Sequence, residues 1–305
     1  MSLNVPASTA DYLSRSACEI EEALLTALPI KWQIPEQLRE AMMYSLQAGG
    51  KRLRPILVLA AAEAVKNSRS ARDSAMPVAC AIEMIHTYSL IHDDLPAMDN
   101  DDYRRGKLTN HKVYGEAMAI LAGDGLLTHA FYAVTQTVKQ GVPPQVALDI
   151  VSDLAKLAGA SGMVGGQAAD ILGEQGVTSL EQLEYIHLHK TSDLIMFSVT
   201  AGARVGEASN DQLLALQEFA IKLGLAFQIQ DDILDLIGDE VKLGKPVQSD
   251  VQQQKVTYPF LIGLKESQAL VERLTAEAKQ ALMKAHLAKP EKLYAIADYL
   301  MNRDH

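Results

Sequence analysis

The chain has 305 residues, 48% of them hydrophobic and 22% charged, with a formal net charge of -10. This composition excludes a disordered chain, and the negative charge argues against a nucleic-acid partner because phosphate backbones bind basic surfaces. No run approaches the ~20 apolar residues of a membrane span, and the N-terminus lacks the pattern of a secretory signal. Cys18 and Cys80 both lie in apolar helical patterns, so we expect buried thiols and a cytoplasmic protein.

Helix is the dominant period along the chain. Apolar residues recur at helical spacing, for example at Leu213, Leu216, Ala220 and Leu223. Strand alternation and Asn-Gly or Asp-Gly hairpins are missing, and the prolines mostly fall between periodic segments. No linker rich in Gly, Ser or Pro divides the chain. We therefore predict an all-α fold in which residues 1–305 form a single domain, one large bundle of about ten to twelve helices.

A cationic loop is predicted at GGKRLRP, residues 49–55. The Gly pair is typical of a helix end, and Pro55 is typical of a first helical turn. Lys51, Arg52 and Arg54 lie between them. Two interpretations stay open, because these cations could either offset the dipole of the preceding helix or bind the oxygens of a phosphate.

The first acidic cluster follows the nearly uncharged segment CAIEMIHTYSLI, residues 80–91. The cluster and the cations after it are Asp93, Asp94, Asp99, Asp101, Asp102, Arg104 and Arg105. Charge runs are usually solvated surface, but these acids lie where an apolar helix ends. Because Pro96 intervenes, regular helix cannot align Asp93 with Asp99, and we expect the helix to end or distort there.

The segment GASGMVGG, residues 159–166, is a glycine cluster without a following Lys-Ser or Lys-Thr. It is therefore not a phosphate-binding loop of the familiar kind. We predict instead that Gly165 and Gly166 permit close helix packing or a kink. Gln167 and Asp170, three positions apart, would share a helical face just beyond them.

The second acidic cluster is DDILD, residues 231–235, at the end of the apolar segment LGLAFQIQ. Residues four apart share a helical face, so Asp231 and Asp235 can direct oxygens toward one metal, whereas Asp232 points elsewhere. Carboxylates without His or Cys suit Mg²⁺, whose shell is completed by water and substrate phosphates. The paired clusters suggest facing sites in one central cavity. Several further cations are suited to phosphate oxygens, namely Arg104, Arg105, Lys190 and Lys245.

A rival interpretation comes from two Glu-x-x-His spacings, Glu83 with His86 and Glu184 with His187. This spacing occurs in di-iron helical bundles, so an oxidase is an alternative. That hypothesis leaves both aspartate clusters and the cationic loop without a role, and we expect the Glu184 pair to lie on an exposed helix surface. No Gly-x-Ser-x-Gly or Cys/His arrangement indicates covalent catalysis.

Together, seven segments resemble the trans-isoprenyl diphosphate synthases, and within that family the bacterial farnesyl diphosphate synthases. They are GGKRLRP, HTYSLIHDDLPAMD, RRG, GMVGGQAAD, HKT, FQIQDDILD and GKP, in the family's order and spacing over nearly the whole chain. The resemblance implies the all-α isoprenoid synthase fold, a homodimer, and condensation of isopentenyl diphosphate with dimethylallyl and then geranyl diphosphate. Pyrophosphate is released, and it is also the plausible base for the proton that is lost.

The resemblance also implies roles for particular residues. About three Mg²⁺ ions, with Mn²⁺ as an alternative, would hold the allylic diphosphate on Asp93, Asp99 and Asp231, supported by Asp94 and Asp235. The same diphosphate would contact Arg104, Lys190 and Lys245. Isopentenyl diphosphate would bind to Lys51, Arg54, His86 and Arg105. Thr191 and Gln228 resemble the residues beside the reacting carbons, so the catalytic set becomes Asp93, Asp99, Lys190, Thr191, Gln228 and Asp231.

Product length is expected to depend on the helix before Asp93. With ~1.5 Å rise per residue, Ser89 and Tyr88 lie about 6 and 7.5 Å before that aspartate. The resemblance places the chain-length aromatic at Tyr88, although ordinary core packing is the commoner fate of such a residue. Alternatives within the fold are a geranylgeranyl diphosphate synthase, a terpene cyclase and an inactive binding subunit. The intact aspartate motifs weigh against inactivity.

Overall fold

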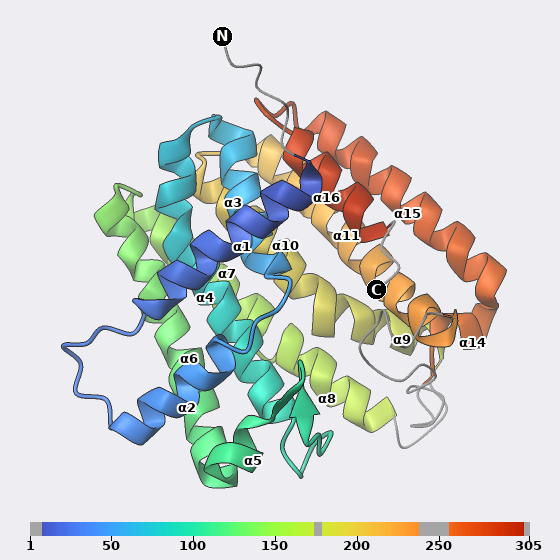
Figure 1. The fold of residues 1–305 in the computed structure, drawn as a ribbon. Helices are drawn as coiled ribbons and strands as arrows, with labels where there is room; N and C mark the ends of the chain where they lie inside the picture. Colours follow the sequence, from blue (N-terminus) through green and yellow to red (C-terminus); the bar gives the residue numbers. More distant parts are fainter. Residues whose placement is uncertain (1–7, 174–178, 238–255, 302–305) are drawn as a thin grey trace. The chain divides into compact units, whose positions relative to one another are not determined.

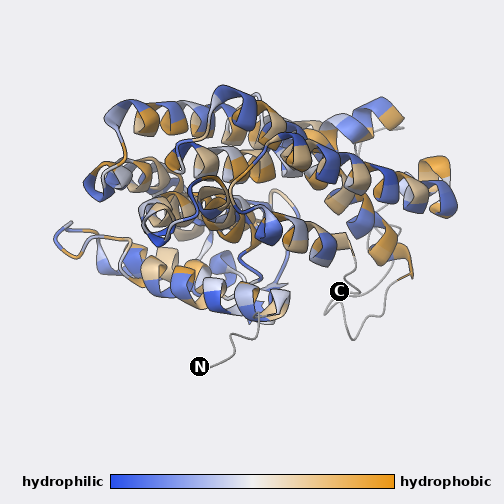
Figure 2. Ribbon diagram, turned by 90° about the horizontal axis from the view of Figure 1, so that it is seen from above, coloured by the Kyte–Doolittle hydropathy of each residue, from blue (hydrophilic) through white to orange (hydrophobic). Residues whose placement is uncertain are grey.

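A computed structural model describes residues 8–173, 179–237 and 256–301. These residues form helices, their connecting turns and one short hairpin, which confirms the all-α prediction (Figure 1). Many of the helices are amphipathic, with polar and apolar residues on different sides of the ribbon (Figure 2). The chain divides into two compact units, so the single domain stays a prediction, and each unit is described by itself.

The first unit contains the described residues up to Leu59 together with Arg69–Val151. Its elements are α1 (Thr9–Leu25), α2 (Glu36–Leu46), the first part of α3 (Leu53–Lys66), α4 (Arg69–Asp93), β1 (Tyr103–Arg104), β2 (Lys107–Leu108), α5 (Asn110–Tyr114), α6 (Glu116–Thr135), the 3₁₀ segment η1 (Gln136–Gln140) and the first part of α7 (Pro144–Ala158).

Helix α4 is the core helix of the first unit. It packs against α6 and also contacts α1 and α2. Gly123 on α6 allows a close approach, since a Cβ there would come within 2.1 Å of Nε2 of His92. Pro77 lies inside α4, although the proline pattern suggested a helix boundary. The helix continues past Pro77 because nearly all residues from 78 to 88 are buried, and this packing outweighs the lost backbone hydrogen bond.

A two-stranded antiparallel hairpin follows α4, and the sequence pattern did not predict it. Tyr103 pairs with Leu108 and Arg104 with Lys107, which leaves Arg105 and Gly106 as a two-residue turn. Both turn residues have positive φ, 52° and 74°, as a type I′ turn requires. Arg-Gly departs from the preferred Asn-Gly and Asp-Gly pairs, so the local sequence carries no hairpin signal.

The second unit contains Ala60–Ser68 and the described residues from Ser152 onward. Its elements are the last part of α3, the last part of α7, α8 (Met163–Gly173), α9 (Leu180–Ile186), the π-helical segment η2 (His187–Ser192), α10 (Asp193–Val205), α11 (Asn210–Ile237), α14 (Tyr258–Ile262), α15 (Leu264–Lys284) and α16 (Glu291–Met301).

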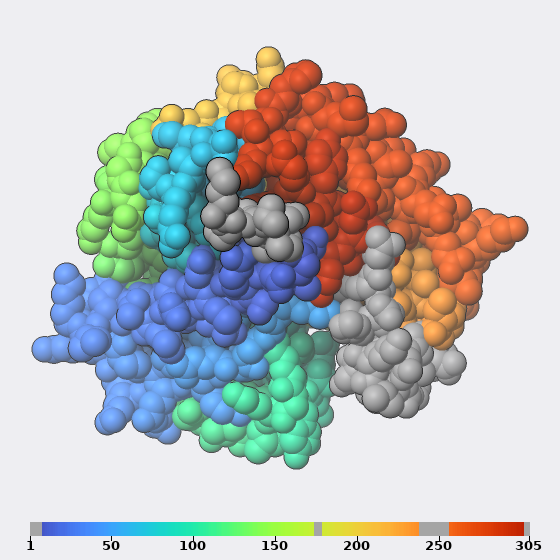
Figure 3. All heavy atoms as spheres, turned by 45° about the horizontal axis from the view of Figure 1, so that its top comes forward, coloured from blue at the N-terminus to red at the C-terminus, as the bar shows by residue number. Residues whose placement is uncertain are grey.

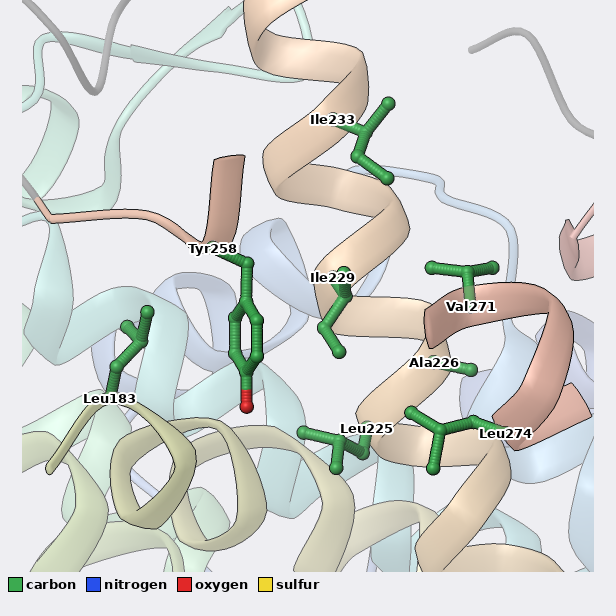
Figure 4. Close-up of a cluster of buried hydrophobic side chains, with 8 residues drawn as sticks. All are labelled: Leu183, Leu225, Ala226, Ile229, Ile233, Tyr258, Val271 and Leu274. Carbon is green, nitrogen blue, oxygen red and sulfur yellow. The ribbon is translucent and has the colours of Figure 1, made fainter. Parts of the chain in front are cut away.

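Helix α11 is the core helix of the second unit. It packs against α10, η2, α14, α15 and α16. A buried apolar cluster joins α9, α11, α14 and α15, and in it the Tyr258 ring lies between Leu183 and Ile229 (Figure 4). The outer atoms of α15 and α16, coloured orange to red, form one continuous part of the surface (Figure 3). This core holds the C-terminal part of α11, which carries the second aspartate motif.

Among the described residues, Glu116–Gln140 is long and apolar enough to cross a membrane by length and composition, although no such segment was expected. A core helix of a soluble protein passes the same test, and 44% of the apolar window is buried in the protein.

Cys80 is buried as expected, but Cys18 is exposed because it lies on the outer side of α1.

Candidate active site

The first aspartate motif lies at the C-terminal end of α4. The helix ends at Asp93, as Pro96 led us to expect, and the chain then turns sharply. The backbone N–H of Asp99 donates to the carbonyl oxygen of Asp93 at 2.8 Å, so this turn brings the two residues together. Asp93 is half-buried and Asp99 is exposed. The turn therefore achieves what a regular helix cannot, which is to hold Asp93 and Asp99 side by side.

Asp94 is turned inward toward Arg104. Its Oδ1 accepts hydrogen bonds from Nε and Nη2 of Arg104, each at 2.7 Å, and Asp101 lies 3.7 Å from the same guanidinium. Burial raises the pKa of Asp94 to about 6, and Arg104 acts in the opposite direction. Asp94 thus fixes the direction of Arg104.

Arg105 points to a different neighbour. Its guanidinium donates to the carbonyl oxygen of Gly49 and lies so close to Gly50 that a Cβ there would come within 2.7 Å of Cζ. Gly49 and Gly50 have φ values of 85° and 131°, which favour glycine. The Gly pair is therefore more than a helix end, because it makes room for a cation carried by the hairpin.

Arg54 and His86 complete this cationic group. Nη1 of Arg54 lies 3.5 Å from Nε2 of His86, and since an arginine can only donate, Nε2 is the acceptor and Nδ1 carries the proton. Burial, followed by the charges of Arg54 and Arg105, lowers the pKa of His86 well below its usual value. His86 is thus a neutral side chain among cations. Lys51 is exposed in the same loop.

Arg52, the middle cation of GGKRLRP, is buried and does not belong to this group. Its Nη1 donates to Oε1 of Glu83 at 2.5 Å. Glu83 was half of a predicted di-iron spacing, but it is occupied by Arg52, while His86 faces Arg54. The other spacing also separates, since Glu184 is exposed and His187 is buried, so the expectation of an exposed pair was only half right.

Tyr88 and Ser89 lie one turn and more before Asp93 on α4. Tyr88 is 5% exposed, and its ring meets the edge of the His92 ring at 5.7 Å. Burial, with a further contribution from Asp93, raises its pKa to about 12. Ser89 is half-buried and donates from Oγ to the carbonyl oxygen of His86 at 2.9 Å. Tyr88 is therefore a large neutral side chain beneath the first aspartate motif.

In the second unit, Lys190 and Thr191 lie on the π-helical segment η2. Lys190 donates from Nζ to Oδ2 of Asp170 on α8 at 2.6 Å. Thr191 donates from Oγ1 to Oε1 of Gln228 on α11 at 2.8 Å, which brings the predicted carbon-facing pair together. Single π turns are rare and are frequently found at functional sites.

The glycine cluster explains how α8 reaches η2. A Cβ on Gly166 would come within 2.2 Å of the backbone nitrogen of Lys190. This confirms the prediction that Gly166 permits close packing. Asp170, one turn further along α8, is thereby placed within reach of Lys190.

The second aspartate motif ends α11. Asp231 is half-buried and Asp235 is buried. Asp232 does point elsewhere, as predicted: its Oδ2 accepts the backbone N–H of Tyr258 at 3.0 Å and lies 3.7 Å from His187. Burial lowers the pKa of His187 to about 3, so that contact is not an ion pair. Lys245 lies outside the described residues.

The donor set of both motifs fits Mg²⁺. All donors are carboxylate oxygens, at the end of α4 in one unit and of α11 in the other. Across the described residues, no three His, Cys, Asp or Glu side chains form a ready metal cage. Mg²⁺ is usually held by one or two carboxylates and completed by water and substrate phosphates.

A surface cavity of about 440 Å³ in the second unit lies apart from these residues. It is lined by the ion-paired Asp153 and Arg204, by Lys156 and by apolar residues of α10 and α11. None of the predicted site residues lines it, so it is not the predicted site.

A model of the polyprenyl synthetase family matches residues 35–295. The chain belongs to this family. That membership confirms the resemblance drawn from the seven sequence segments. One relative, the farnesyl diphosphate synthase of Geobacillus stearothermophilus, is 50% identical over 98% of this chain and 99% of its own length. Another, the chloroplastic geranylgeranyl pyrophosphate synthase of Capsicum annuum, is 47% identical over 96% of this chain and 78% of its own length.

Solved structures of the family share the fold. The geranyltransferase of Helicobacter pylori, crystallised with magnesium and isoprenyl diphosphate, aligns with a TM-score of 0.83 and 32% identity over 99% of this chain and 100% of that chain. The family fold thus accommodates magnesium and an isoprenyl diphosphate in at least one member.

Proposed function

We propose that this chain is a farnesyl diphosphate synthase, which condenses isopentenyl diphosphate with dimethylallyl and then geranyl diphosphate. The observation that carries the proposal is the divergence of two adjacent arginines. Arg104 is held by Asp94 of the aspartate motif, whereas Arg105 is held by the carbonyl oxygen of Gly49, two residues before Lys51. Two separate groups for anions suit two diphosphate substrates, whereas a terpene cyclase needs only one.

The isopentenyl substrate would bind through its diphosphate to Lys51, Arg54, His86 and Arg105. Arg54 and Arg105 offer planar forks that match phosphate oxygens, and neutral His86 offers an N–H. Binding is therefore charge-assisted without a metal. Its role in catalysis is to hold the nucleophilic double bond in place, so that an encounter of two molecules becomes a step within one complex.

The allylic substrate would bind at the aspartates, with Asp93, Asp99 and Asp231 as the main ligands and Asp94 and Asp235 in support. When bound, Mg²⁺ supplies Lewis acidity that stabilises the departing pyrophosphate. Arg104 and Lys190 add donors to the same leaving group. No protein nucleophile is needed, because preorganised charge stabilises what leaves.

The allylic cation that remains would face Thr191 and Gln228. Their hydrogen bond occupies the hydroxyl proton of Thr191 and leaves oxygen lone pairs available to stabilise positive charge. The isopentenyl double bond attacks the cation, and the new carbon–carbon bond forms. The proton then lost from the isopentenyl unit passes to the released pyrophosphate.

The geranylgeranyl synthase activity named for some relatives is the second candidate. Relatives at 46–47% identity carry that name, close to the 50% of the farnesyl relative. The large buried Tyr88 favours the shorter product, because a growing prenyl chain must pass the space below Asp93.

Incubating the purified protein with labelled isopentenyl diphosphate and dimethylallyl diphosphate, followed by chromatography of the dephosphorylated products, tests the proposal. We expect farnesol as the main product, only with Mg²⁺ or Mn²⁺. A twenty-carbon product would identify the second candidate. Turnover without divalent metal, or two tightly bound irons per chain, would favour the oxidase instead.

The proposal extends to the protein's state in the cell. We propose a homodimer in the cytoplasm, with about three Mg²⁺ per active site when both substrates are bound. Family membership supports the dimer. The molar mass of the purified protein, measured by light scattering, would test the dimer directly.

A further inference from the structure

Arg52 differs from the neighbouring cations Lys51 and Arg54 in its burial and its backbone conformation. It is 3% exposed and has a φ of 48°, a left-handed conformation that only a few per cent of non-glycine residues adopt. Its side chain donates to Oε1 of Glu83 at 2.5 Å and to the carbonyl oxygen of Leu46 at 2.6 Å. A third acceptor, Glu21, lies 3.4 Å from Nε. The guanidinium therefore joins α1, α2 and α4 to the loop that carries Lys51 and leads into α3, whose first turn carries Arg54.

Glu83 connects this buried pair to the substrate group. It lies three residues before His86 on α4, and residues three apart share a helical face. Its side chain is 2% exposed and that of Arg52 is 1% exposed. The ion pair thus fixes Arg52 to one turn of α4. His86, which is proposed to bind isopentenyl diphosphate, lies on the next turn. Arg54, two residues after Arg52, meets His86 at 3.5 Å.

Stability alone is a weak reason for this arrangement. A buried ion pair is often no better than apolar residues of the same volume, and the left-handed backbone of Arg52 adds strain. The pair does give the loop a defined direction. The pair also cancels its own charge, so the net positive charge near the ligand comes from Lys51, Arg54 and Arg105.

We infer that Arg52 and Glu83 are positioning residues for isopentenyl diphosphate, which hold the 49–52 loop and the first turn of α3 in the conformation that presents Lys51 and Arg54. The inference rests on the proposed function and adds to it two residues that bind neither substrate. Glu83 acts through Arg52, so its carboxylate would matter for one substrate and not for the other.

The test is Glu83→Gln, which keeps the shape and removes the charge. We expect the KM for isopentenyl diphosphate to rise at least about tenfold, while the KM for geranyl diphosphate stays within about twofold. Glu83→Asp, which restores the charge at shorter reach, should recover part of the loss. Calorimetric titration with isopentenyl diphosphate should rank the affinities in the same order, with the wild type tightest, Glu83→Asp next and Glu83→Gln weakest. If Glu83→Gln does not fold, the KM values for isopentenyl diphosphate and geranyl diphosphate can be compared in Glu83→Asp and Arg52→Lys instead.

A matched control separates positioning from simple stability. Glu19→Gln removes the carboxylate partner of Arg72, a neighbouring ion pair of 2.6 Å between α1 and α4 in the same unit. It should lower the melting temperature and leave the KM for isopentenyl diphosphate unchanged. Glu21→Gln, which removes the half-exposed partner of Arg52, should raise that KM less than Glu83→Gln.

Two failures can be told apart. A wild-type protein that neither binds isopentenyl diphosphate nor makes prenyl product overturns the proposed function. A wild-type protein that does both, while Glu83→Gln keeps its KM and affinity or shifts both substrates equally, overturns the inference. An equal KM rise in Glu19→Gln would overturn it as well.

Discussion

Gly166→Ala tests whether the contact between α8 and η2 positions Lys190 and Thr191. The added Cβ would lie 2.2 Å from the backbone nitrogen of Lys190 and 2.8 Å from its Cα, whereas ordinary contacts begin at 3.4 Å. The atoms in the way belong to the backbone, so no flexible side chain can move aside. The segments must separate by about 1 Å (3.4 minus 2.2) to relieve the overlap.

Such a displacement has a predictable size of effect. A misplacement of about 1 Å at a reacting group lowers kcat/KM by about a hundredfold, or about 2.7 kcal/mol of transition-state stabilisation. Overpacking should also lower the free energy of unfolding by about 1–3 kcal/mol, partly offset by the better helix propensity of alanine, about 1 kcal/mol. Activity should therefore fall much more than stability.

The assay measures farnesyl product from geranyl and isopentenyl diphosphates, well below the melting temperature of each variant. Gly125→Ala on α6 is the control, because its Cβ would meet only the flexible thioether of Met42, at 3.1 Å from Sδ. That variant should keep its activity. If Gly166→Ala kept wild-type kcat/KM, the close contact would not position Lys190, and our reasoning would be wrong.

Tyr88→Ala should shift the product from fifteen carbons to twenty or more with activity largely kept; a destabilised variant with unchanged product would show that Tyr88 is only core. Asp231→Asn should lower turnover by orders of magnitude in a folded protein, whereas Asp232→Ala should mainly destabilise, by about 1–3 kcal/mol, because it orphans the N–H of Tyr258. Equal loss of turnover in both folded variants would contradict this assignment. Between pH 3.8 and about 6, folded Asp94 keeps a proton that the unfolded chain releases, so its contribution to stability falls as pH rises. In metal-free buffer, Asp94→Asn should therefore gain melting temperature relative to wild type from pH 4.5 to 7, and a constant difference would refute the shift.

Local patterns predicted much of this molecule. Helical period indicated the fold class, because most helices bury one apolar stripe. Pro96 indicated the end of α4, and that end allows Asp99 to return to Asp93. The four-residue spacing of Asp231 and Asp235 separated them from Asp232 for the same geometrical reason. Each of these predictions depends on residues within a few positions of one another.

The remaining features depend on partners far apart in the sequence. Nothing in GGKRLRP distinguishes Arg52 from Lys51, because its partner Glu83 lies 31 residues away. The same contact removed Glu83 from the di-iron spacing. Gly50 is explained only by Arg105, which reaches it from the hairpin. Sequence patterns report the type of a residue, whereas its direction is decided by tertiary contacts.

The hairpin at 103–108 sets a strict limit on length in this part of the chain. Successive residues of a strand face opposite sides, and a two-residue turn tolerates no change of register. One inserted or deleted residue would turn Arg104 away from Asp94 and Arg105 away from Gly49, although every charge would still be present. We therefore expect substitutions at the exposed Tyr103 and Lys107 to be tolerated in designed variants, while a single-residue change of length would separate Arg104 from Asp94 and Arg105 from Gly49.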